Sequence, residues 1–266
     1  FINCIHQPLL GTFSTNYLTN DLMTKLRYLS LDRTTGVNLK KLSKRIQALS
    51  VLSLADCDLE ISEVLETLGN AQLDKLRYLN LSGNKMTRTT KTELPANLER
   101  FHVSNVSWGS GVFPEFLKYF LSQKFDFGLK FNCSSAQDVS DDDWEAVSDT
   151  LSEIQNYPLA ELSWSYNKVS ESLITYLSKN TNLTTLFISN CFKIDEEPEA
   201  YQQFCKKVTI MESLKNLVIN GSEGFELGDQ SSALFESLKQ LKSLNLLVVD
   251  SNNLGDEGVQ NIKELI

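Results

Sequence analysis

The sequence has 266 residues, 41% hydrophobic and 22% charged, which is enough apolar material for a sizeable core and excludes wholesale disorder. Its net charge is -9 at pH 7 and its lysines and arginines are scattered, so it lacks the basic patch that nucleic acid or anionic membrane binding requires. Five cysteines, an odd count without framework spacing, favour a reducing, cytoplasmic compartment, and no apolar run approaches the roughly 20 residues of a transmembrane helix.

A nine-residue pattern, LxxLxLxx followed by a small polar residue, recurs along the chain. In chain order the clear copies are LRYLSLDRT from Leu26, LSVLSLADC from Leu49, LRYLNLSGN from Leu76, LAELSWSYN from Leu159, LTTLFISNC from Leu183, LKNLVINGS from Leu214 and LNLLVVDSN from Leu244. Weaker copies are LERFHVSNV from Leu98 and DFGLKFNCS from Asp126, which lacks the first leucine. The mean spacing of about 27 residues lies within the 20 to 29 of leucine-rich repeats.

The segments between these predicted strands carry apolar residues at helical spacing. The stripes are Val64, Leu65 and Leu68; Phe113, Phe116, Leu117 and Phe120; Trp144, Val147, Leu151 and Ile154; Leu173, Tyr176 and Leu177; Leu234, Leu238 and Leu241; and Val259, Ile262 and Leu265. Strands on a concave face and helices on a convex face predict an α/β, right-handed solenoid of the ribonuclease-inhibitor-like type. Because repeats stack to bury their leucines, we expect a single domain over residues 1–266 with about nine to ten repeats.

The ninth position of the pattern is mostly a small hydrogen-bonding residue. Its members, called the ladder below, are Thr34, Cys57, Asn84, Val106, Ser134, Asn167, Cys191, Ser222 and Asn252. The backbone bends after each strand and leaves buried polar groups, which a donor at this position can bond in the adjacent coil. The sequence therefore predicts that Cys57 and Cys191 are structural rather than reactive, and that Asn105 replaces Val106, which cannot donate.

The chain opens on FINC, which aligns with positions six to nine of the pattern and places Cys4 in the ladder. On this alignment the chain begins within a further repeat, and we expect it to be a fragment of a longer protein.

Sequence features that could support catalysis or metal binding are weak. The acidic run DVSDDDWE at 138–145 lacks the ligand spacing and central glycine of an EF-hand loop, whereas Ser140 as a helix cap followed by three aspartates in the first turn explains it. His6 and His102 are far apart and have no partner at a recognised spacing, and no phosphate-binding glycine loop occurs. The sequence therefore predicts no enzyme, no cofactor and no metal.

Alternation along a strand directs positions three, five and seven to the concave side. These positions supply the candidate partner-binding residues Tyr28, Tyr78, Arg100, His102, Lys130, Phe187, Val218, Leu246 and Val248. The tyrosines lie at one end and a basic patch of Arg100, His102 and Lys130 in the middle. The other end carries an apolar strip, defined as Phe187, Val218, Leu246 and Val248. The alignment places Gly128 at position three and Lys130 at position five. Single exposed apolar residues are normal, but adjacent ones form a patch, so we expect a protein partner on this face.

The central segments ELPANLERFHVSN, SSAQDVSDDDWEAVSDTLSEI and LAELSWSYNKVSESLITYLSKNTNLTTLFISNCFKI resemble the corresponding repeats of the CARMIL family of actin capping-protein regulators. The resemblance covers about residues 94 to 222 and lies in the order of features: a proline-led strand, a weak repeat, a long acidic helix and the LSKN turn. Trp164 and Val106 depart from the family pattern. The resemblance implies a cytosolic scaffold at the cell cortex, with actin-regulatory partners bound through flanking segments that this sequence does not contain.

Two other function classes fit a horseshoe. A ligand-sensing or inhibitory repeat domain, such as a nucleotide-binding receptor's sensor or a ribonuclease inhibitor, is one, although an inhibitor of that type has dense cysteines and an acidic or tryptophan-rich concave face. A RanGAP-type GTPase activator is the other, and it requires an arginine or asparagine set in an inter-repeat loop. No residue of this sequence is marked out for that role.

Overall fold

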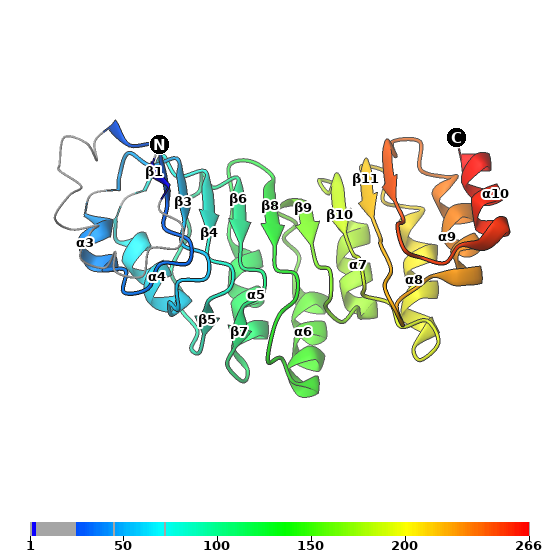
Figure 1. Cartoon of the computed structure of the whole chain (residues 1–266), viewed down its shortest axis with the longest axis horizontal. Helices are drawn as coiled ribbons and strands as arrows, with labels where there is room; N and C mark the ends of the chain where they lie inside the picture. The colour runs from blue at the N-terminus through cyan, green and yellow to red at the C-terminus, as the bar shows by residue number, and fades with distance from the viewer. Residues whose placement is uncertain (1, 4–24, 45, 72, 266) are drawn as a thin grey trace.

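The computed structural model describes residues 2–3, 25–44, 46–71 and 73–265. Within these ranges ten parallel strands form one sheet in the order β1-β2-β3-β4-β6-β8-β9-β10-β11-β12. Figure 1 shows the strands side by side along the long axis of the molecule, with the helices on one side of the sheet. The other side is the concave face. The predicted α/β solenoid is therefore confirmed.

The elements follow the predicted repeats closely. The strands of the main sheet are β1 (Ile2–Asn3), β2 (Tyr28–Ser30), β3 (Val51–Ser53), β4 (Tyr78–Asn80), β6 (Arg100–His102), β8 (Leu129–Asn132), β9 (Leu159–Ser163), β10 (Thr185–Phe187), β11 (Asn216–Val218) and β12 (Leu246–Val248). The helices are α3 (Leu39–Ser43), α4 (Ile61–Gly69), α5 (Val112–Ser122), α6 (Asp141–Glu153), α7 (Glu171–Lys179), α8 (Pro198–Val208), α9 (Ser231–Leu238) and α10 (Gly255–Leu265), with a 3-10 turn η1 (Gly228–Gln230). Strands β5 (Lys85–Met86) and β7 (Ser107–Trp108) pair separately.

The core lies between the sheet and the helices. The residue at position four of each coil is buried from Leu29 through Leu217, and the position-six residues from Leu31 through Ile219 are buried beside them. The helical stripes pack against this layer, as in α5, where Phe116 and Phe120 stack in parallel with ring centroids 5.5 Å apart. Each coil buries its apolar face only against its neighbours, which is the energetic basis of a solenoid.

Position eight of almost every coil turns the chain with a left-handed backbone. The residues are Arg33, Asp56, Gly83, Asn105, Ser135, Tyr166, Asn190 and Ser251, with φ between 53° and 68°. This turn lets the position-eight amide donate to the position-seven carbonyl of the next coil, as Tyr166 does to Ser189 at 2.9 Å. The turn disfavours bulky side chains, because the Cβ atom crowds the following carbonyl.

The ladder is confirmed at most of its positions. Cys57 Sγ donates to the Leu31 carbonyl at 3.1 Å and Cys191 Sγ to the Trp164 carbonyl at 3.5 Å. Asn84, Asn167 and Asn252 donate to the preceding coil in the same way, at 2.8, 2.9 and 2.8 Å. These contacts satisfy carbonyl groups that water does not reach.

Three details of the predicted ladder are wrong. Asn105 does not replace Val106: it occupies the left-handed turn, and its side chain makes no hydrogen bond to the described residues. Ser222 is exposed, because the 222–226 segment loops outward before the coil resumes at Leu227. Ser134 is not a ladder residue, since the coil of β8 starts two residues later than the sequence alignment places it.

That shift has a local cause in the pairing of β8 with β9. Leu129 pairs with Leu159 and so takes the place of the first leucine, while the next residue, Lys130, pairs with Glu161 across a register irregularity. Gly128 therefore precedes the strand, and Lys130 stands at position three rather than five. A Cβ on Gly128 would come within 2.7 Å of the Ala160 Cβ, so the irregular pairing requires glycine there.

At the N-terminus the predicted alignment of FINC is also wrong. Ile2 pairs with Leu29 and Asn3 with Ser30, which places them at positions four and five instead of seven and eight. Cys4 and His6 lie outside the described residues. The short FINC segment fits the pattern in more than one register, and the strand pairing selects one.

Where the side chains are described, the helix predictions hold with one exception, and the side chain of Leu265 lies outside that set. The Ser140 hydroxyl accepts a hydrogen bond from the Asp143 amide at 3.2 Å and caps α6, as expected. In α10, however, Val259 is 50% exposed rather than buried. The helix packs through Gly258 and Ile262, four residues apart: a Cβ on Gly258 would meet Ser231 Oγ of α9 at 3.2 Å, and this close approach turns Val259 outward.

Candidate functional site

Two parallel columns of side chains on the concave face hold the predicted candidates. Strand register sets position three in the order Tyr28, Val51, Tyr78, Arg100, Lys130, Glu161, Thr185, Asn216 and Leu246. Position five runs Ser30, Ser53, Asn80, His102, Asn132, Ser163, Phe187, Val218 and Val248. All nine sequence-predicted candidates lie in these columns, although Lys130 lies in the position-three column instead of the predicted position-five column.

Tyr78 and His102 form a direct contact that sequence reasoning missed. Their rings meet edge-to-face with centroids 5.0 Å apart, and Tyr78 Oη lies 3.3 Å from His102 Nδ1. Burial lowers the pKa of His102 and the positive charge of Arg100 lowers it further. The imidazole is therefore neutral at pH 7, and its Nδ1 can accept the hydrogen bond from the tyrosine hydroxyl. Tyr78 stands at position three of one repeat and His102 at position five of the next, and these positions in the sequence could have predicted the contact.

Burial also raises the pKa of Tyr78, and the nearby Asp32 carboxylate adds to the shift. Asp32 itself is fixed in a polar network, since its Oδ1 accepts hydrogen bonds from the Ser53 hydroxyl at 2.6 Å and the Ala55 amide at 2.8 Å. Asn80 Nδ2 donates to the same Ser53 hydroxyl at 3.1 Å. This end of the concave face is thus a set of mutually bonded polar groups around a tyrosine.

The predicted basic patch is reduced by an ion pair. Lys130 Nζ lies 3.3 Å from Glu161 Oε2, its neighbour in column three, so much of its charge is compensated. His102 is neutral, as described above. Arg100 is exposed and has no ion pair to the described residues, so it is the remaining net positive charge of the patch.

The apolar strip is continuous in the structure. Phe187, Val218 and Val248 are direct neighbours in column five, and Leu246 flanks them in column three with 48% of its surface exposed. Phe187, Val218 and Val248 are half-buried. Beside them, Asn216 Nδ2 donates to the Thr185 hydroxyl at 2.9 Å, which gives the strip a polar border.

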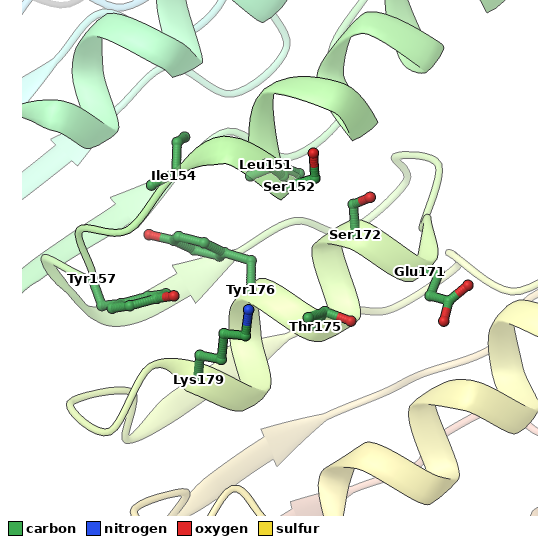
Figure 2. Close-up of a pocket in the computed structure, with 9 residues that line it drawn as sticks. All are labelled: Leu151, Ser152, Ile154, Tyr157, Glu171, Ser172, Thr175, Tyr176 and Lys179. Atoms are coloured by element: carbon green, nitrogen blue, oxygen red, sulfur yellow. The ribbon is translucent and has the colours of Figure 1, made fainter.

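The helical side holds cavities that no sequence-predicted site residue lines. One, of about 340 Å³, is formed by α6, α7 and the loop between them. Figure 2 shows the Tyr176 ring extending toward the loop that carries Tyr157, and the two ring centroids are 5.3 Å apart. The Tyr176 hydroxyl is buried without a hydrogen-bond partner among the described residues, and burial raises its pKa.

No three His, Cys, Asp or Glu side chains among the described residues gather into a group that could hold a metal ion. None of the described helices is both long and apolar enough to cross a membrane.

Comparison with known proteins agrees with the architecture. A leucine-rich repeat family model matches residues 75–101, the segment from before β4 into β6. Among solved structures, an internalin from Listeria monocytogenes is similar with a TM-score of 0.50 and 16% identity, over 92% of this chain and 66% of that one. A leucine-rich repeat protein from Leptospira interrogans is similar with a TM-score of 0.46 and 17% identity, over 93% of this chain and 60% of that one.

No curated protein sequence matches the chain. The chain spans less than two thirds of the length of either structural neighbour. At 16% identity the likeness to the internalin shows a shared fold. The chain therefore has the fold of a leucine-rich repeat protein, and residues 75–101 match the family model.

Proposed function

We propose that the chain is a non-catalytic interaction scaffold that binds a protein partner on its concave face. The observation that carries this proposal is the apolar strip, four adjacent side chains on a face that none of the described helices covers (Figure 1). Adjacent exposed apolar residues are costly in water and mark contact surfaces more often than scattered ones do. Tyr78 and Arg100, further along the same face, belong to the residue types enriched at binding hot spots.

The chemistry of the thiols supports a non-catalytic role. Burial raises the pKa of Cys57 to about 11, of Cys191 to about 12 and of Cys205 to about 11. Burial raises the pKa of Cys133 as well. Because the thiolate is the nucleophile, these four side chains are unreactive near pH 7.

The finer part of the proposal concerns cellular role. The resemblance of residues 94 to 222 to CARMIL repeats supports a cytoplasmic scaffold at the cell cortex with actin-regulatory partners. The negative net charge supports a protein partner over nucleic acid or an anionic membrane.

The test is capture of partners from a cell lysate with the wild-type chain and with the double variant Phe187→Asp/Val218→Asp. Two carboxylates in the strip should weaken partner capture by about tenfold or more, since they must be desolvated on binding. Both side chains are only half-buried, so the variant should fold, as judged by circular dichroism.

Lys118→Ala is the matched control, because Lys118 lies on helix α5, away from the concave face, and among the described residues it pairs with Glu153 at 3.2 Å. Capture that is equal for wild type and double variant would exclude the apolar strip as the partner site. If the proteins lost by the double variant include no actin regulators, the cortical role is wrong while the scaffold role stands.

A further inference from the structure

A second candidate site lies at the rim of the sheet, outside the concave columns. Two cavities of about 430 and 250 Å³ meet there, because Lys168, Val169 and Glu197 line both. Together they form the rim groove, whose characteristic residues are Trp144, Glu145, Tyr166, Lys168, Val169, Asn190, Glu197 and Phe225. None of these residues belongs to the proposed concave-face site.

The side-chain carboxamide of Asn190, which lines the rim groove, has no hydrogen-bond partner among the described residues. Asn190 is 6% exposed, and its side chain makes no hydrogen bond to the described residues, with Oδ1 fully buried. The Nδ2 donor also has no partner among the described residues, and a bound ligand that accepts from it gains a hydrogen bond. The next coil offers nothing to bond it, because position eight there is Gly221, where a Cβ would come within 2.5 Å of the Ser251 carbonyl.

A carboxamide presents one acceptor and two donors. A peptide main chain presents the complementary pair, one N–H and one C=O per residue. Because Oδ1 is closed off from solvent, a peptide in the groove meets this side chain through Nδ2, which can donate to a main-chain carbonyl of an extended segment.

Tyr166 stands beside Asn190 at position eight of the preceding coil. Its backbone has φ 64°, an unfavourable conformation for a bulky residue, and its side chain is 63% exposed. Burial in the fold therefore does little to offset the backbone strain. The exposed ring is available to contact a ligand beside Asn190, and tyrosine is a residue type enriched at binding hot spots.

The larger cavity offers an apolar anchor position. Trp144 and Trp164 meet edge-to-face there with centroids 6.0 Å apart, and Val147, Leu151 and Leu173 complete an apolar lining. The Trp164 indole N–H is already bonded to the Lys168 carbonyl at 2.8 Å. The cavity thus favours an aromatic or aliphatic side chain.

The charged side chains that line the rim groove determine which ligand charge the groove favours. Lys168 pairs with Asp141 at 2.5 Å and Lys193 with Glu196 at 3.2 Å, so both cations are compensated. Glu145 and Glu197 are exposed and have no ion pair to the described residues. Two uncompensated carboxylates on the walls favour a positively charged ligand.

We propose that the rim groove binds an extended, basic peptide segment of a protein partner, with an apolar side chain in the Trp144 cavity and its main chain bonded to Asn190. This site is independent of the apolar strip, so it can stand if the concave-face proposal fails.

The test is selection of a phage-displayed library of random dodecapeptides on the full chain, followed by fluorescence polarisation with the enriched peptides. We expect peptides that combine Arg or Lys with an aromatic or aliphatic residue. Asn190→Gly should weaken their binding by about tenfold, because the hydrogen bond from Nδ2 to the peptide main chain is lost. Glycine tolerates φ 55°, so this variant retains the turn.

Further variants separate the contributions. Tyr166→Gly removes the strained aromatic side chain and should also weaken the peptides. Glu197→Gln should reduce binding and its salt dependence, whereas Glu199→Gln, an exposed neighbour on α8 that does not line the groove, should leave both unchanged. Phe187→Asp/Val218→Asp should bind the peptides as wild type does.

Three outcomes would overturn the proposal. The first is that selection yields no peptide whose binding depends on Asn190. The second is that the enriched peptides are acidic. The third is that Asn190→Gly and Glu199→Gln bind the peptides equally well.

Discussion

Replacing the buried Asn84 with alanine should lower the free energy of unfolding more than replacing an exposed asparagine with alanine does. Asn84 is 5% exposed, and its Oδ1 accepts from the amides of Cys57 at 3.1 Å and Leu59 at 3.0 Å. Its Nδ2 donates to the carbonyls of Leu54 and Leu81, both at 2.8 Å. Alanine leaves four buried backbone groups without partners.

Each buried group left unpaired costs about 1–3 kcal/mol, and water entering the vacated space offsets part of the sum, so we expect a loss of about 3–5 kcal/mol. Urea unfolding followed by tryptophan fluorescence measures it. Hydrogen exchange should show lost protection at the Cys57 and Leu59 amides specifically. Asn97→Ala is the control, since Asn97 Nδ2 bonds the Asp74 carbonyl in an exposed setting and its loss should cost about 0.5 kcal/mol or less. A loss below about 1 kcal/mol for Asn84→Ala, with both amides still protected, would refute the reasoning.

Two further predictions concern titration. Because the pKa of His102 is lowered in the fold, the unfolded chain binds this proton more readily, and stability should fall as pH decreases below about 6.5. His102→Gln should remove this loss of stability at low pH. An NMR titration midpoint at or above 6.5 for His102 would contradict the prediction. The raised pKa values of Cys57, about 11, and Cys191, about 12, predict that both resist iodoacetamide at pH 8 in the native state and react in urea. Equal labelling rates in the two states would show that the ladder does not protect these thiols.

The strands were predictable because their buried leucines repeat with a fixed internal spacing. The pattern failed at β8, where Leu129 stands at position one and the next residue, Lys130, stands at position three. The coil therefore lacks one residue of the pattern, and a register irregularity absorbs the difference. Leucine spacing alone does not distinguish a lost first leucine from a displaced one. Gly128 was the available signal, since close backbone approach at a bulge favours glycine.

The concave columns were predictable for the same reason, and the rim groove was not. Alternation along a strand assigns a face to each side chain, whereas a cavity between coils depends on how loops of unequal length pack. Tyr166 was visible in the sequence at position eight. The sequence does not show that position eight has a left-handed backbone, a conformation that is unfavourable for tyrosine.

The two proposed surfaces are close enough to act together. Phe187 of the apolar strip and Asn190 of the rim groove belong to one coil and are three residues apart, at most about 10 Å of extended chain. A partner that occupies both holds its second contact at an effective concentration in the millimolar range, so two weak contacts can produce a tight complex. Disrupting either surface should then weaken capture of the whole partner, whereas an isolated groove peptide should respond to Asn190→Gly and not to Phe187→Asp/Val218→Asp. If Phe187→Asp/Val218→Asp also weakened the isolated peptide, strip and groove would have to be one continuous site, and their separate assignment would be wrong.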